Sequence, residues 1–136
     1  MFDLPIRRLN ICGKSLSLSL SLSLSLSLTY KYNRKHCCTL QVLNVGDCSH
    51  LGNESIECIV GMKDVGRTLL SLTFFNCPLV DDSTLQCVAA TCTSLQTLNV
   101  RMCGKLSVVA ATDRQEKERL KQCIFASIPS LQRLAC

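Results

Sequence analysis

The chain has 136 residues and a formal net charge of +5, and the whole excess lies in residues 1–36, which hold six Lys or Arg and one acidic residue. Residues 37–136 hold nine basic and nine acidic residues, so they lack the basic footprint that phosphate binding needs. The sequence therefore argues against nucleic-acid binding, and it argues against an enzyme because it contains no acid–base pair, nucleophile motif or phosphate loop.

Residues 1–36 are predicted to be a basic, low-complexity segment. Seven Ser-Leu pairs run from Ser15 to Leu28, and their strict alternation is typical of a strand with one apolar face. The tract is too short and too polar to cross a bilayer as a helix. A signal peptide is disfavoured because half of the tract is serine and no small-residue cleavage site follows it. A CT dinucleotide repeat encodes alternating Leu and Ser in every reading frame, which favours an expanded or mis-annotated genomic stretch. We expect this segment to be disordered or mis-annotated, without function and without a role at a membrane.

A framework of the form Leu-x-x-Leu-x-Leu-x-x-Cys recurs along residues 37–136. Its positions are Leu40, Leu43, Val45 and Cys48; Leu69, Leu72, Phe74 and Cys77; Leu95, Leu98, Val100 and Cys103; and, clipped, Leu131, Leu134 and Cys136. Successive copies start 29, 26 and 36 residues apart, a period typical of leucine-rich repeats. We predict an α/β leucine-rich-repeat solenoid of three to four repeats, with short parallel concave strands and convex helices. The last unit is incomplete, and a shortened echo of the framework occurs at Leu9-Asn10-Ile11-Cys12.

The second half of each unit has helical spacing. In residues 82–90, Leu85, Val88 and Ala89 fall at i, i+3 and i+4, so they line one face of a predicted helix, and Asp81 or Asp82 is placed to cap it. The longest step contains an insertion near residues 107–116, which predicts an extra helical turn or loop. The mixed charges of residues 113–119 predict an exposed helix face with an Asp113–Lys117 pair.

The eleven cysteines follow the repeat. Cys48, Cys77 and Cys103 share one repeat position, and Cys58, Cys87 and Cys123 share another, so free thiols are expected to stack in rows as small apolar core residues. This use of cysteine favours a reducing compartment, cytoplasmic or nuclear. A zinc site at His36-Cys37-Cys38 is disfavoured because three adjacent ligands do not close a tetrahedral site and no Cys-x-x-Cys occurs. We expect no metal and no cofactor.

Partner contacts are expected on the concave strand surface. The outward strand positions supply amide and hydroxyl groups, one aromatic ring and arginines, of which the last two are common interface anchors. The candidate partner-binding residues are Asn44, Thr73, Phe75, Asn99, Arg101 and Arg133. Phe75 and Arg101 lead this set. The alternative is that Phe75 packs over its neighbours, that Arg101 is a solvated charge, and that the Asn44/Asn99 match reflects repeat ancestry.

The pattern Cys-Pro-x-Val-x-Asp-x-x-Leu-x-x-Val-Ala-x-x-Cys-x-x-Leu, from Cys77 to Leu95, resembles the cysteine-containing leucine-rich repeats of F-box/LRR proteins and of the related antagonist-of-mitotic-exit proteins. The resemblance implies that the repeats recruit a protein substrate while a separate F-box binds Skp1 in a cullin-based ubiquitin ligase. No F-box-like segment precedes the repeats here, so Skp1 and cullin are expected only if an F-box lies outside this chain. A stand-alone leucine-rich-repeat scaffold without a ubiquitin link, or a truncated fragment, is the alternative.

Overall fold

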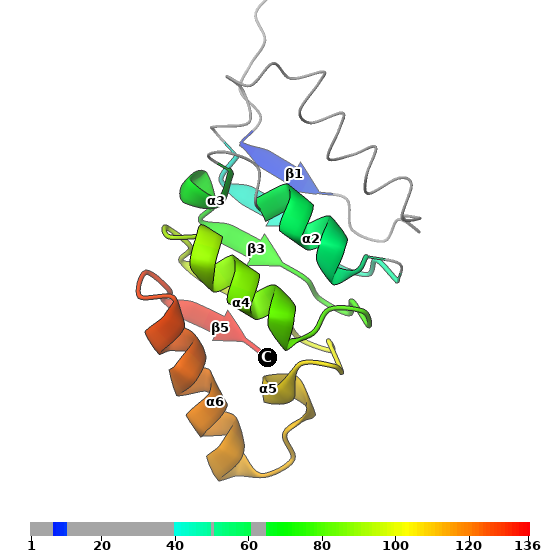
Figure 1. The fold of residues 1–136 in the computed structure, drawn as a ribbon, viewed down its shortest axis with the longest axis vertical. Coiled ribbons are helices and arrows are strands. Elements are labelled where there is room, and N and C mark those ends of the chain that lie inside the picture. The colour runs from blue at the N-terminus through cyan, green and yellow to red at the C-terminus, as the bar shows by residue number, and fades with distance from the viewer. Residues whose placement is uncertain (1–6, 11–39, 50, 61–64) are drawn as a thin grey trace, which may run out of the picture.

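The computed structural model describes residues 7–10, 40–49, 51–60 and 65–136, which form an α/β fold around an all-parallel sheet (Figure 1). Five three-residue strands follow one another in chain order across the sheet. They are β1 (Arg8–Asn10), β2 (Val42–Asn44), β3 (Ser71–Thr73), β4 (Thr97–Asn99) and β5 (Arg133–Ala135). The Ser-Leu tract and the His36-Cys37-Cys38 cluster considered for zinc lie outside the described residues.

The leucine at the centre of each strand sets the register of the sheet. Leu43 pairs with Leu72, and Leu72 pairs with Leu98, each in a parallel ladder. These three side chains are buried, while both flanking residues of each strand are half-buried. Burying a leucine fully contributes about 1.5–3 kcal/mol, so a row of stacked leucines favours this register over a slip by one residue, which would turn each leucine to the other face. The predicted α/β class and the predicted strands are confirmed.

The sheet extends upstream of residue 37, where the repeats were predicted to start. Arg8, Leu9 and Asn10 pair in parallel with Val42, Leu43 and Asn44. The shortened copy of the repeat framework at residues 9–12 therefore begins within β1, which belongs to the same sheet as the strands of the later copies.

Helices connect β2 to β3, β3 to β4 and β4 to β5, and they cover one face of the sheet (Figure 1). They are α2 (Asn53–Val60), α3 (Val65–Thr68), α4 (Asp82–Thr91), α5 (Ser107–Ala110) and α6 (Arg114–Ser127). The predicted helix in the central unit is confirmed as α4, with Leu85 and Val88 buried and Ala89 packed against the core. Asp81 caps it: the carboxylate accepts a hydrogen bond from the Ser83 backbone nitrogen at 2.9 Å, which satisfies a helix-end donor.

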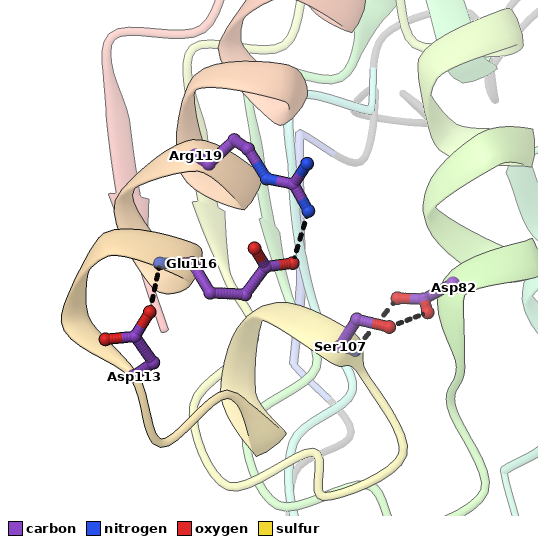
Figure 2. A network of polar contacts seen from close by, with 5 residues as sticks. All are labelled: Asp82, Ser107, Asp113, Glu116 and Arg119. Carbon is purple, nitrogen blue, oxygen red and sulfur yellow. Dashed lines mark hydrogen bonds and ion pairs between the residues drawn. The ribbon is translucent and has the colours of Figure 1, made fainter.

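The insertion in the longest connection, predicted as a helical turn or a loop, begins with a helical turn. It supplies the short helix α5, whose first residue, Ser107, donates its backbone N–H to Asp82 at 3.0 Å and its hydroxyl to the same carboxylate (Figure 2). A cavity of about 250 Å³ remains between α4, α5 and α6, lined mainly by apolar side chains such as Leu85, Val108 and Ile124. The helix α6 has no fully buried residue, so it packs less closely than α4.

The predicted Asp113–Lys117 pair is not formed. Asp113 is instead the N-cap of α6, where its carboxylate accepts the Glu116 backbone N–H at 3.2 Å (Figure 2). A residue at that position is outside the helix, and its short side chain folds back onto the first turn. The ion pairs of α6 are Glu116–Arg119 at 2.6 Å and Glu118–Lys121 at 3.0 Å, both spaced i,i+3. Exposed pairs of this kind stabilise a helix only slightly.

Polar side chains link the N-terminal turn of α2 to that of α4, and the N-terminal turn of α4 to that of α5. The Asn53 side-chain amide at the start of α2 donates to the Asp81 carboxylate at 2.7 Å and to the Ser83 hydroxyl at 3.0 Å, and its carbonyl accepts the Thr84 hydroxyl. Bonds from Ser83 and Asn53 lower the pKa of Asp81 because they favour its charged form. The Asp82–Ser107 contact repeats this link between α4 and α5, so neighbouring helices are held at their N-terminal ends.

Gly66 in α3 allows close contact between two helices. A Cβ atom at this position would lie 2.5 Å from the carbonyl oxygen of Thr91, the last residue of α4. Backbone atoms cannot rotate away as the end of a side chain can, so only glycine fits here without a shift of the helices.

We therefore expect Gly66→Ala to lower the free energy of unfolding by roughly 1–3 kcal/mol, the cost typical of overpacking. Urea unfolding followed by circular dichroism measures the change. Gly104→Ala is the matched control, since an added Cβ there would meet nothing within 4 Å. Equal stability of the two variants would contradict the proposed close approach.

Candidate protein-binding surface

The strand residues that point away from the helices form one surface, here called the strand surface. It consists of Val42, Asn44, Ser71, Thr73, Thr97 and Asn99, all half-buried, together with the exposed Arg8 and Arg133. Within the described part of the chain, the helices lie on the opposite face of the sheet (Figure 1). A sheet face without a covering layer has to meet solvent or another molecule.

The parallel register arranges these residues in rows across the strands. Asn44, Thr73 and Asn99 form one row, and Val42, Ser71, Thr97 and Arg133 form the next. The predicted contact residues Asn44, Thr73 and Asn99 are thus neighbours, while Arg133 lies in the adjacent row at the edge of the sheet. Adjacent parallel strands lie about 4.8 Å apart, so one partner segment can touch several strands.

Phe75 and Arg101 extend the strand surface beyond the ends of β3 and β4. The Asp47 N–H bonds to the Phe75 carbonyl at 2.7 Å, and the Asn76 N–H bonds to the Arg101 carbonyl at 2.9 Å, so the backbone ladder continues past the strands. Arg101 is exposed, and Phe75 is half-buried beside Gly46, where an added Cβ would lie 3.4 Å from that of Phe75. Phe75 therefore packs against its neighbour and still presents part of its side chain.

Asn44 and Asn99 have a structural task in common. The Asn44 side-chain carbonyl accepts the Gly46 N–H at 3.0 Å, and the Asn99 side-chain carbonyl accepts the Arg101 N–H at 3.1 Å. Asparagine often stabilises a turn by bonding to the backbone two residues on. This shared bond gives a physical reason for the Asn44/Asn99 match and leaves the amide nitrogens as the groups available to a partner.

A left-handed residue follows at the same place in three units. Asp47, Asn76 and Met102 have φ angles of 56°, 54° and 61°. Asp and Asn adopt this conformation more readily than most residues, whereas Met102 does so with 62% of its surface exposed. The Asn76 amide also donates to the Asp47 carboxylate at 3.1 Å, which ties two of these turns together. The turns fix the direction in which Phe75 and Arg101 leave the sheet.

Sequence reasoning missed a further row and the first strand. Backbone bonds align Arg7, Gln41, Leu70, Gln96 and Gln132: the Gln41 N–H bonds to Arg7, the Leu70 N–H to Gln41, and so on across the sheet. Arg7 and Arg8 are both exposed at the β1 edge. The available signal was the Leu9-Asn10 pair, which matches Leu43-Asn44 and Leu98-Asn99, but the Ser-Leu tract separates it from the later units.

The thiols at the first repeat position are buried donors. Cys48, Cys77 and Cys103 are fully buried, and the Cys77 and Cys103 thiols donate to the carbonyls of Val45 and Phe74 in the preceding unit, at 3.2 and 3.0 Å. Burial raises the pKa of Cys77 to about 12 and also raises the pKa of Cys103. These thiols act as packing groups, as predicted.

The second cysteine row differs from the prediction. Cys87 is half-buried, but Cys123 is exposed, because α6 does not press its face as closely against the core; the side chain of Cys58 lies outside the description. Among the described residues, no three His, Cys, Asp or Glu side chains come together in a way that could hold a metal ion. None of the described helices has the length and apolar character needed to cross a membrane.

The Asn99 bond can be separated from any contact that Asn99 makes with a partner. Asn99→Ala should lower the free energy of unfolding by about 1 kcal/mol, because the Arg101 N–H loses its acceptor. Asn99→Asp retains an acceptor oxygen and should keep most of that stability while it loses the amide donor. Urea denaturation of both variants measures this, and equal losses would show that the turn bond contributes nothing.

The buried Cys77 thiol predicts a pH dependence. Between about pH 9 and 12 the unfolded chain releases the thiol proton while the folded chain retains it, so stability is fully present below pH 9 and declines as the pH rises. Urea unfolding at pH values from 8 to 11 should show a shallower decline for Cys77→Ala than for the unaltered chain. Parallel declines would indicate that the thiol ionises equally in both states.

Comparisons with known proteins do not assign a family. No protein-family model matches the chain, and the search of curated proteins finds no significant match. The strand surface and the Cys77–Leu95 motif are therefore the features that bear on function.

Proposed function

We propose that the chain is a leucine-rich-repeat module of the cysteine-containing, F-box/LRR type, which binds a protein partner through its strand surface. The equally spaced parallel strands, of which β2, β3 and β4 are each followed by helical chain on one side, are compatible with a solenoid of such repeats. The motif from Cys77 to Leu95 supports the F-box/LRR type: its cysteines at 77 and 92 and its apolar residues at 80, 85, 88 and 95 are all buried.

The strand surface, which no helix of the described residues covers, carries this proposal. It offers hydroxyl and amide groups from Thr73, Thr97 and Asn99, which adapt to different hydrogen-bond partners, beside one aromatic ring and several exposed arginines. Aromatic and arginine side chains dominate the binding energy of many interfaces. A surface held by backbone ladders keeps these groups in place before a partner arrives, which reduces the entropy lost on binding.

The proposed role is substrate recognition in an SCF-type (Skp1–cullin–F-box) ubiquitin ligase, in ubiquitin-dependent protein catabolism. The module would hold the target, and the chemistry would belong to other subunits, so this chain needs no catalytic residue or cofactor of its own. Skp1 and cullin would join through an F-box outside this chain. Thiols that act as packing groups, as at Cys77 and Cys103, suit a reducing compartment, the cytoplasm or the nucleus.

Phe75→Ala combined with Arg101→Ala should weaken partner capture by at least about tenfold, since each side chain is a candidate hot spot. Capture from a lysate by the tagged chain, with quantification of companions by mass spectrometry, measures the effect. The matched control is Phe125→Ala with Arg114→Ala, which removes one aromatic and one arginine from the exposed face of α6. Unchanged circular dichroism verifies folding, and undiminished capture would remove Phe75 and Arg101 from the contact set.

The ubiquitin link is tested by immunopurification of the native protein through an epitope in residues 77–106, followed by intact-mass measurement. Skp1 and cullin among the companions, with a mass well above that of the 136-residue chain, would support the proposed role. A mass near 15.0 kDa without them would replace it with a free-standing binding protein.

A further inference from the structure

Charge is unevenly divided between the two faces of the fold. The strand surface and its extensions carry four exposed arginines, Arg7, Arg8, Arg101 and Arg133, and no Asp or Glu occurs in their rows. The described carboxylates belong to helices or helix caps, apart from Asp47 in the turn after β2. Residues 37–136 have no net charge as a whole, but the strand surface is basic. Arg7 and Arg8, which lie upstream of residue 37, add two positive charges to this surface.

Five carboxylates of the helical face are already engaged within the chain. Asp81 accepts bonds from Asn53 and Ser83, Asp82 from Ser107, and Asp113 from the first turn of α6. Glu116 and Glu118 pair with cations of their own helix. In contrast, the structure shows no ion pair for the four arginines of the strand surface within residues that it describes. Arg114 and Lys117 on α6 likewise have no ion pair there, so what distinguishes the strand surface is that no carboxylate shares the rows of its arginines.

Two of these arginines, Arg8 and Arg133, lie at opposite edges of the sheet. Arg8 pairs with Val42 in β1–β2, and the same row ends at Arg133 in β5, four strand spacings away. At about 4.8 Å per spacing this is roughly 19 Å between backbones. Val42, Ser71 and Thr97 lie between them and carry no charge, so a partner with two separated acidic groups matches this row better than one with a single cluster.

We propose that the strand surface binds an extended acidic segment of a protein partner, with Asp or Glu residues about six positions apart. This inference rests on the proposed protein-binding function and specifies the chemistry of the partner. An extended chain spans about 3.3 Å per residue, so about six residues bridge 19 Å. Arginine binds carboxylates through two parallel hydrogen bonds, which adds orientation to charge, while the neutral middle of the row suits hydroxyl and apolar side chains.

A nucleic acid fits this surface less well. Phosphates follow one another closely along a strand, and binding them usually takes a continuous basic groove with several aromatic platforms. Here the row that begins at Arg7 continues with the uncharged Gln41, Gln96 and Gln132, so the four arginines form no continuous groove. Phe75 is the single aromatic residue among the strand-surface positions.

The test uses the full chain and a fluorescein-labelled peptide with a Glu residue at each end of a five-residue Ser/Thr/Pro spacer. Binding is followed by fluorescence anisotropy at low salt. Binding should weaken as salt rises, because exposed charges are screened. Arg8→Gln and Arg133→Gln should each weaken it by about two- to fivefold, as expected for exposed ion pairs. The matched control, Arg114→Gln with Lys117→Gln on α6, should leave it unchanged. A peptide with Gln in place of Glu should not bind.

Three results would overturn the inference: no binding of the acidic peptide, an equal loss in the α6 control, or tighter binding of an oligothymidylate than of the peptide. The last would assign the surface to single-stranded nucleic acid. If the acidic peptide fails while capture of a cellular partner still depends on Phe75 and Arg101, the proposed protein-binding function stands and only the acidic chemistry is wrong.

Discussion

The parallel backbone ladder determines the position of everything else in this molecule. Hydrogen bonds link each strand to the next in one unbroken register, with Leu43, Leu72 and Leu98 stacked at its centre. Each connection between two strands, whatever its own length, must therefore bring the chain back to the position where the next strand pairs in register. The steps of 29, 26 and 36 residues all do so, because the difference is taken up by α3 in one connection and by α5 in another.

Much of the fold could be predicted because its signals are local. The Leu-x-Leu spacing identifies the strands, Asp81 before a helical pattern identifies the start of α4, and the long third step identifies an inserted turn. The buried cysteine row followed from equivalent positions in successive units. In each case the decisive residues lie within a few positions of one another or repeat at a fixed period.

The remaining features depend on lateral neighbours, which a single sequence does not show. Asn53 looks like an ordinary helix start, and only the packing of α2 against α4 brings it to Asp81. Gly66 has no local reason to be glycine until Thr91 of α4 lies against it. Cys123 shares the repeat position of Cys87 but is exposed, because the inserted turn changes how α6 packs. Likewise the outward strand positions could be identified from the Leu-x-Leu spacing, but the one-sided charge of the strand surface could not, because the acidic residues cancel it in the total.

The one-sided placement of the helices has a consequence for shape. The helices α2, α4 and α6 each accompany one step of the sheet, yet packed helices need 8–10 Å between their axes while strands need only about 4.8 Å. The helical layer is therefore wider per step than the strand layer, and the two remain in contact only if the sheet bends with its strands on the inner arc.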